Sequence, residues 1–106
     1  MEYRLPRRHE ERTASQALVT KMRGLGWDVW RITPGKYGTA GMPDIYAIHP
    51  EHGIRWIETK TPRGKLRPSQ KKFVLMHARL QIPVYVLMGP EGYSKLFGPP
   101  NWMYFL

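Results

Sequence analysis

The sequence contains no cysteine. Disulfide frameworks, thiolate zinc sites and cysteine nucleophiles are therefore excluded. The sequence also lacks an apolar run long enough to cross a membrane. Its first residues, Met-Glu-Tyr-Arg-Leu-Pro-Arg-Arg, lack the apolar core of a signal peptide. These absences predict a soluble intracellular protein, which we expect in the cytoplasm.

Acidic residues are scarce. The 106 residues include 8 Asp and Glu against 17 Lys and Arg, which gives a formal net charge of +9. A positive excess of this size in a short chain favours a polyanionic partner, and nucleic acid is the first candidate. The alternative is a basic but otherwise ordinary surface. The length predicts a single domain that spans residues 1–106.

Two apolar, β-rich segments, residues 41–48 and 54–60, flank the turn-prone sequence His-Pro-Glu-His-Gly. This pattern predicts a β-hairpin. If Ile48 and Ile54 form the last pair before the loop, Asp44 lies directly opposite Glu58, with Cβ atoms roughly 5 Å apart.

Like charges placed opposite one another destabilise a strand pair. A hard divalent cation with oxygen ligands would turn that repulsion into a binding site. Lys60 lies two residues after Glu58, so strand alternation puts it on the same face. Asp44, Glu58 and Lys60 are together suited to metal-assisted hydrolysis of a phosphodiester.

These residues form the pattern Pro43-Asp44 followed by Glu58-Thr59-Lys60. The pattern resembles the PD-(D/E)XK nuclease superfamily. With Gly41-Met42 before it and Leu66-Arg67-Pro68-Ser69-Gln70 after it, the sequence more closely resembles the VRR-NUC family, over roughly residues 11 to 88. The resemblance implies an α/β fold with a restriction endonuclease-like core, in which helices flank a mixed β-sheet. Residues 89–106 form an aromatic-rich extension outside the match.

The resemblance also implies roles at the site. Asp44, Glu58 and the carbonyl group of Thr59 would bind Mg²⁺ or Mn²⁺. Lys60 would orient and assist the attacking water. Gln70 would orient Lys60 or the phosphate, although it could instead cap its helix.

A helix is predicted from near Glu10 to about Arg23, ending at Gly24 and Gly26. Its apolar stripe consists of Ala14, Leu18, Met22 and Leu25. At about 100° per residue, Glu11 lies within about 20° of Leu18 and Met22, whereas Glu10 lies about 100° from Leu18. The resemblance implies a Glu at this point of the active site, holding a second metal or its water, and Glu11 is the better match. The alternative is an acid that suits the helix dipole.

A second helix is predicted from an N-cap at Ser69 to about Gln81. Lys71 and Lys72 fall in its first turn, where cations oppose the helix dipole. No acidic capping-box residue appears at position 72. This breach of the usual helix rules favours an anion such as phosphate at the helix N-terminus.

Strands are also predicted at residues 27–33 and 83–88, the second as a central strand because it is continuously apolar. Between the first strand and the hairpin lies a glycine-rich loop with Lys36 and Tyr37, which would let a nucleic-acid backbone approach closely. The alternative is a plain connecting loop. The predicted backbone-binding residues are Lys36, Tyr37, Arg63, Lys65, Arg67, Lys71 and Lys72.

The function that these features favour is a divalent-metal-dependent DNA endonuclease. The resemblance points to Holliday-junction resolvases that act as homodimers on branched DNA. We therefore expect a homodimer and a branched or duplex DNA partner, with residues 102–106 as a candidate subunit contact. The alternatives are a flap or nicking nuclease and a non-catalytic nucleic-acid-binding module.

Overall fold

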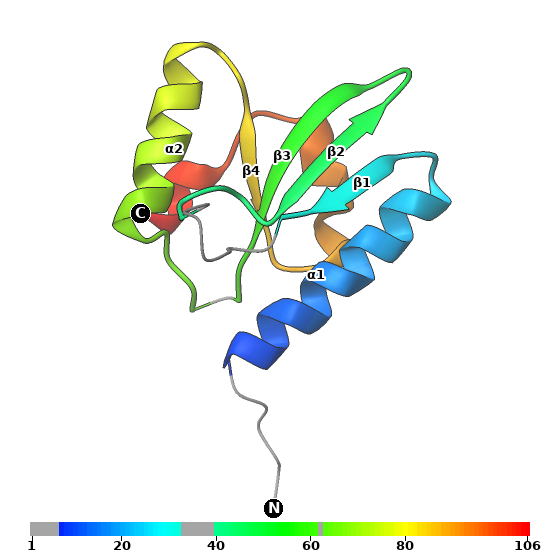
Figure 1. Cartoon of the computed structure of the whole chain (residues 1–106), viewed down its shortest axis with the longest axis horizontal. Helices are drawn as coiled ribbons and strands as arrows, with labels where there is room; N and C mark the ends of the chain where they lie inside the picture. The colour runs from blue at the N-terminus through cyan, green and yellow to red at the C-terminus, as the bar shows by residue number, and fades with distance from the viewer. Residues whose placement is uncertain (1–6, 33–39, 62) are drawn as a thin grey trace, which may run out of the picture.

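A four-stranded mixed sheet lies at the centre of the protein (Figure 1). The computed structural model describes residues 7–32, 40–61 and 63–106, with side chains from Thr13 onward. The strands lie side by side in chain order and are β1 (Asp28–Arg31), β2 (Ile45–His49), β3 (Gly53–Thr59) and β4 (Val84–Leu87). The first three pair antiparallel, whereas β4 pairs parallel to β3.

Helices flank the sheet on both sides. Helix α1 (Arg7–Gly24) precedes the sheet, and helix α2 (Pro68–Arg79) connects β3 to the parallel strand β4. Two 3-10 helices, η1 (Pro90–Phe97) and η2 (Trp102–Phe105), complete the chain. This arrangement confirms the predicted α/β fold with a mixed sheet between helices.

The predicted hairpin register is confirmed. Ile48 pairs with Ile54, and Ile45 pairs with Ile57. The reversal between β2 and β3 ends at Gly53, whose φ of 81° lies in the left-handed region that favours glycine. The turn chemistry and the alternation of apolar residues therefore fix the same register.

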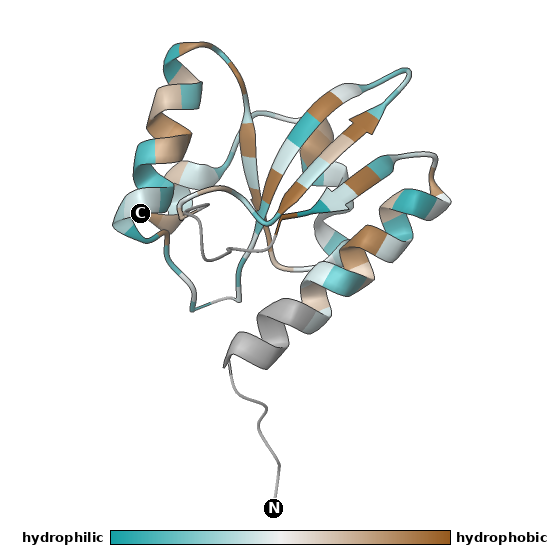
Figure 2. Ribbon diagram, viewed as in Figure 1, coloured by the Kyte–Doolittle hydropathy of each residue, from teal (hydrophilic) through white to brown (hydrophobic). Residues whose placement is uncertain are grey.

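One face of the sheet is closed by α1 and η1. Leu18, Val19 and Met22 of α1 pack with Ile45 and Ile57 in a continuous buried core. Leu96 of η1 joins this core. On the opposite face, α2 and η2 cover only the β3–β4 half, through a smaller cluster that includes Val74, Val84, Val86 and Leu66. Figure 2 shows brown apolar residues in the strands, interspersed with paler and teal ones.

Helix α1 begins at Arg7, three residues before the predicted start, and ends at Gly24. A Schellman motif terminates it, since the amide of Trp27 bonds the Met22 carbonyl and the amide of Gly26 bonds the Arg23 carbonyl. Gly26 has the required positive φ of 95°. Leu25 was predicted to extend the buried stripe, but it precedes this turn and is exposed.

Strand β4 lies at the edge of the described sheet, so its prediction as a central strand is wrong. It is nevertheless buried along its whole length. The side-chain amide of Asn101 covers the open edge, accepting from the amide of Val86 and donating to its carbonyl, both at 2.8 Å. The C-terminal segment thus supplies hydrogen bonds to the open edge of β4, as a further strand would.

Candidate active site

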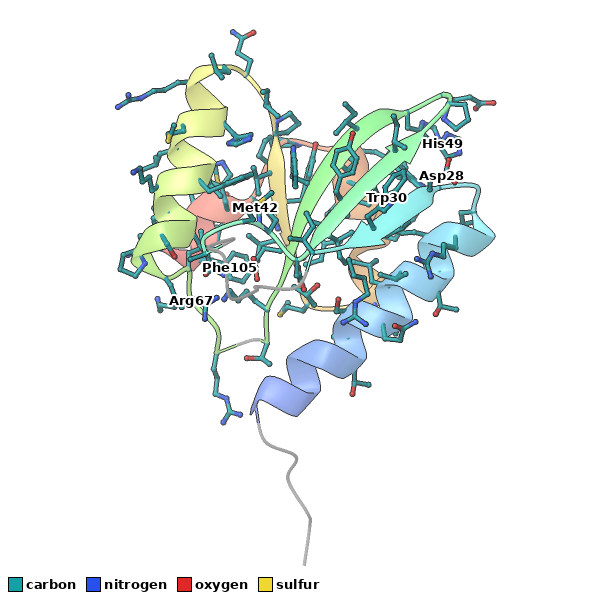
Figure 3. All side chains as sticks on the ribbon, in the orientation of Figure 1. Asp28, Trp30, Met42, His49, Arg67 and Phe105 are labelled. Carbon is teal, nitrogen blue, oxygen red and sulfur yellow. The ribbon has the colours of Figure 1, made fainter. Side chains whose placement is uncertain are left out.

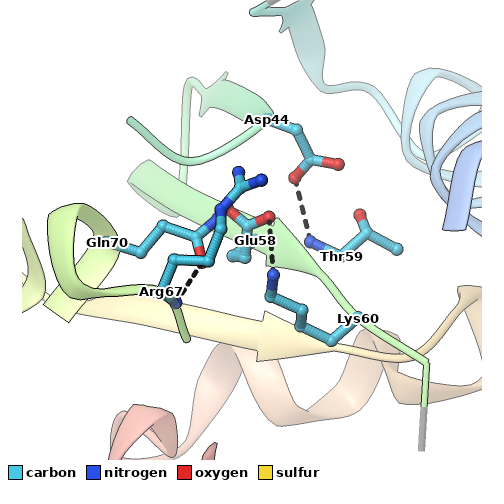
Figure 4. Close-up of polar contacts among 6 residues, drawn as sticks. All are labelled: Asp44, Glu58, Thr59, Lys60, Arg67 and Gln70. Carbon is cyan, nitrogen blue, oxygen red and sulfur yellow. Dashed lines mark hydrogen bonds and ion pairs between the residues drawn. The ribbon is translucent and has the colours of Figure 1, made fainter. Parts of the chain in front are cut away.

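The end of the hairpin remote from its turn brings three predicted site residues together (Figure 4). Glu58 and Lys60 are both buried, with 8% and 6% of their surface exposed. The Lys60 ammonium lies 3.9 Å from Glu58 Oε1. The backbone amide of Lys60 bonds the Leu87 carbonyl, which fixes the residue at the end of β4. Buried charges require partners of this kind.

Asp44 does not sit in the strand pairing directly opposite Glu58 as predicted, because the ladder ends at the Ile45–Ile57 pair. The reason lies in the preceding residue. Continuing the register by two residues would place Pro43 opposite Thr59, and proline has no amide hydrogen to donate. Asp44 Oδ1 instead accepts a 2.9 Å hydrogen bond from the Thr59 amide. The carboxylate therefore lies across the end of the ladder.

The same geometry orients the carbonyl group of Thr59. In an extended strand, the N–H and C=O of one residue point to the same side. The Thr59 amide points to Asp44, whereas the next amide, that of Lys60, points to β4. The Thr59 carbonyl therefore faces the Asp44 side of β3, where Pro43 supplies no donor for it.

Burial raises the pKa of the Asp44 carboxyl above its usual value of 3.8. The hydrogen bond from the Thr59 amide lowers this pKa and is the largest of the opposing effects. The hydroxyls of Thr59 and Ser15 also lower the pKa. Both hydroxyls are buried, and neither makes a fully formed hydrogen bond within the described part of the chain. A cation beside Asp44 would offset the unfavourable burial of its charge.

Ser15 was not predicted as a neighbour of the site. The signal was present, because Ser15, Leu18, Val19 and Met22 follow the i, i+3, i+4, i+7 spacing of one helix face. All four residues are buried. Glu11 lies one helical turn before Ser15 in α1. Its side chain falls outside the described residues, so its predicted role stays a prediction.

Gln70 is brought to the site but also caps its helix. Its Oε1 accepts a 2.8 Å hydrogen bond from the amide of Arg67, and its side chain is 3% exposed. Figure 4 shows the side chain pointing from α2 toward Glu58. The prediction of Ser69 as N-cap is wrong, because Arg67 occupies that position and Pro68 begins the helix. The capping alternative for Gln70 is confirmed, and its active-site role stays a prediction.

This shift of the cap changes the argument about Lys71 and Lys72. They occupy the fourth and fifth helical positions, since Pro68 is the first. The amide of Lys71 already bonds the Arg67 carbonyl. Because Gln70 at the third helical position supplies a capping-box interaction, the missing acid at position 72 breaks no capping rule, and the inference of an anion at the helix N-terminus loses that support.

Gly41 ties the loop before Asp44 to the start of α2. Its φ is 91°, and a Cβ atom there would lie 2.5 Å from the Ser69 carbonyl oxygen. Only glycine fits both the backbone conformation and the space. The close approach places Pro43-Asp44 beside the first turn of α2, which carries Gln70.

The predicted backbone-binding residues on the described chain are mostly at the surface. Arg63, Lys65, Arg67 and Lys72 are exposed and Lys71 is half-buried. Lys65 Nζ also donates to the carbonyl of Leu106, at 3.4 Å. Lys36 and Tyr37 lie outside the described residues.

The donor set has the chemistry of a magnesium or manganese site. Asp44, Glu58 and the Thr59 carbonyl supply hard oxygen atoms, which these ions prefer. Among the described side chains, those of residues 13–32, 40–61 and 63–106, no group of three or more Asp, Glu, His or Cys would hold a metal. A site here therefore depends on the Thr59 carbonyl and on ligands beyond the two carboxylates.

Comparison with known proteins gives two matches. The model of the VRR-NUC domain family matches residues 8–91. The chain belongs to this family. A solved structure described as a VRR_NUC domain shares the fold, with a TM-score of 0.70 and 22% identity over 83% of this chain and 94% of that chain. A search of curated proteins gave no match.

Family membership gives this VRR-NUC domain a nuclease-type function. Its matched residues include the whole hairpin, all of α2 and all of α1 but its first residue. Among the described helices of the domain, none is both long and apolar enough to cross a membrane.

Proposed function

We propose that the protein is a divalent-metal-dependent DNA endonuclease that selects branched DNA, as Holliday-junction resolvases do. One observation carries this proposal: Asp44, Glu58 and Lys60 converge at one end of the hairpin of a VRR-NUC domain. The formal charge of +9 supports a nucleic-acid substrate.

Asp44, Glu58 and the Thr59 carbonyl would hold Mg²⁺ or Mn²⁺, and Glu11 would add a further oxygen ligand. When bound, the ion would lower the pKa of a water and stabilise charge on the phosphate oxygens. The Lys60 ammonium, held near Glu58, would orient the attacking water. Gln70 would steady Lys60 or the phosphate through the part of its amide that does not cap α2.

The cations on the turn before α2 and on its first residues, all at least partly exposed, would bind the DNA backbone. These residues are Arg63, Lys65, Arg67, Lys71 and Lys72, and Lys36 with Tyr37 would contribute from the loop. Each phosphate contact releases counterions, so affinity should fall steeply with salt. Such contacts position DNA without reading its sequence.

We further propose that the enzyme acts as a homodimer, because a symmetric four-way junction requires two symmetric cuts and each chain has one site. Met103, Tyr104 and Leu106 are the exposed members of the predicted contact at residues 102–106. Trp102 and Phe105 pack mainly against the core of their own chain. Sedimentation at micromolar concentration tests this: a monomeric mass with activity first order in enzyme would contradict it.

The decisive assay compares a linear duplex, a flap and a four-way junction, each with Mg²⁺, with Mn²⁺ and with EDTA. We expect metal-dependent, symmetric cleavage of the junction and little cleavage of the duplex. Preferential cutting of the flap, or single nicks, would assign the domain to those nuclease classes instead. Tight binding without cleavage under either metal would make it a binding module.

A further inference from the structure

An aromatic row crosses three strands on the incompletely covered face of the sheet. Trp30 of β1 pairs with Tyr46 of β2, and Tyr46 pairs with Trp56 of β3. Their ring centroids are 5.6 Å and 4.9 Å apart. Directly paired residues share a face of the sheet, so the three rings form one continuous surface. We call Trp30, Tyr46 and Trp56 the aromatic row.

One end of the aromatic row is covered and the other is open. Trp56 packs edge-on against Phe73 of α2, at 5.5 Å. Trp30 has 52% of its surface exposed (Figure 3). Within the described residues, the buried cluster under α2 and η2 contains no member of β1 or β2. The open half of this face therefore presents a large ring to solvent.

The aromatic row adjoins the candidate active site. Tyr46 lies two residues after Asp44, and Trp56 lies two residues before Glu58. Two residues along a strand span roughly 7 Å. This is about the length of two stacked nucleotides, at roughly 3.4 Å each. A phosphate bound at this site, beside Lys60, would thus bring neighbouring bases over the row.

The chemistry of the row suits bases rather than another protein surface. Cross-strand aromatic pairs do stabilise sheets, but this role gives no reason for leaving the Trp30 ring half exposed. Aromatic rings beside a cationic, backbone-binding site are the elements with which proteins hold unpaired nucleic-acid strands. The exposed cations Arg67 and Lys72, together with the buried Lys60, provide the charge for the backbone.

We propose that the aromatic row is a stacking platform for unpaired DNA bases next to the scissile phosphate. This inference rests on the proposed nuclease function and narrows its substrate class. The preferred DNA would carry unpaired bases within a few nucleotides of the cut, as at the opened branch point of a junction. A fully paired duplex would not reach the row, because its bases are stacked on each other.

Binding without metal tests the platform separately from catalysis. The probe is a short single strand in which one base is 2-aminopurine, whose fluorescence changes when it stacks. Trp30→Ala should weaken binding of this strand about 5- to 150-fold, the range for loss of one stacked base. Trp30→Tyr keeps a ring and should retain affinity within about threefold. Binding of the matched duplex should change little in either variant.

Phe97→Ala provides a matched control. Phe97 is 47% exposed and makes ring contacts with Trp27 and His52, and it lies on η1, which packs against the closed face. Its removal should leave single-strand binding unchanged. Circular dichroism establishes that each variant is folded. An equal loss of affinity in Trp30→Ala, Trp30→Tyr and Phe97→Ala would overturn the platform, as would a wild-type protein that does not alter the 2-aminopurine signal.

Cleavage then separates this inference from the proposed function. Wild type and Trp30→Ala are compared with Mn²⁺ on a duplex and on the same duplex with three unpaired bases. If the row is a stacking platform, Trp30→Ala should lower the cleavage rate only on the substrate with unpaired bases. Equal rates on both substrates for both proteins would overturn the platform while leaving the endonuclease intact. If no DNA is cleaved, the endonuclease proposal fails, and the metal-free binding result alone decides the platform.

Discussion

The same strands form both faces of the sheet, but the two faces differ in chemistry. Along β3, Ile57 is fully buried under α1, whereas its neighbours Trp56 and Glu58 belong to the other face. The closed face is a continuous apolar core. The other face carries the aromatic row together with Glu58, while the Asp44 carboxylate lies across the end of the β2–β3 ladder. Because side chains alternate, one strand can stabilise the fold and build the site at once.

This division has a direct consequence for mutation. Substitutions one residue apart on β3 should change different quantities, one the free energy of unfolding and the other the rate of cleavage. The predictions that follow exploit this alternation, and they test whether the two faces are as separable as the burial pattern indicates.

The largest expected effect belongs to the site. Glu58→Ala and Lys60→Ala should each reduce metal-dependent cleavage by at least about 10²-fold, a typical loss when one charge-stabilising group is removed. Junction binding should survive because the surface cations remain. Single-turnover rates and gel shifts measure the two quantities. Full activity in either variant would remove that residue from the active site.

The neighbouring residue should show the reverse pattern. Ile57→Ala creates a cavity in the closed core and should lower the free energy of unfolding by about 2–5 kcal/mol. Cleavage per folded molecule should change much less than in Glu58→Ala. Chemical denaturation and assays well below the melting temperature provide the comparison. Loss of cleavage by folded Ile57→Ala would mean that the two faces are not separable.

The open edge of the sheet should show an intermediate effect. Asn101→Ala removes both hydrogen bonds to Val86 and should destabilise the fold by about 1–3 kcal/mol. Asn101→Asp keeps an acceptor for the Val86 amide but loses the donor to the Val86 carbonyl. Its destabilisation should therefore come mostly from this carbonyl, which is left without its hydrogen bond. If Asn101→Ala is as stable as wild type, water replaces the amide and the C-terminal segment does not secure β4.

The sequence predicted the hairpin well because two independent signals agree there. The loop between Ile48 and Ile54 and the alternation of Ile45 with polar neighbours both select the observed register. This register brings Asp44 near Glu58 and Lys60, although Asp44 accepts from the Thr59 amide instead of pairing opposite Glu58. The aromatic row was missed, although the same register already paired Tyr46 with Trp56.

Other features depend on contacts between distant segments, which periodicity does not encode. A continuously apolar β4 reads as a central strand, but the edge beside it is filled by Asn101, a single amide 15 residues away. Ser69 is a better N-cap by residue type than Arg67. Two contacts favour the earlier start of α2, at Pro68. Gly41 approaches the Ser69 backbone closely, and the Gln70 side chain accepts from the Arg67 amide.

The smallest expected change in stability belongs to Asp44→Asn, which tests whether the buried Asp44 carboxylate destabilises the metal-free fold. Asp44→Asn should abolish cleavage, because the variant loses an anionic metal ligand. In EDTA it should be as stable as wild type or more stable, because the amide carries no charge to bury. The amide oxygen can keep the hydrogen bond from Thr59. Mg²⁺ should raise the melting temperature of wild type, since it binds only the folded site, and the variant should lose most of that rise.

The pH dependence of this difference follows from the raised pKa of Asp44. The folded protein holds the Asp44 proton more tightly than the unfolded chain, so this carboxyl favours folding fully below pH 3.8 and progressively less as pH rises through its folded pKa. Asp44→Asn has no such titration. Its stability relative to metal-free wild type should therefore increase from pH 4 to pH 7, as measured by melting in EDTA. A difference that shrinks with rising pH would mean that the ionised carboxylate stabilises the fold.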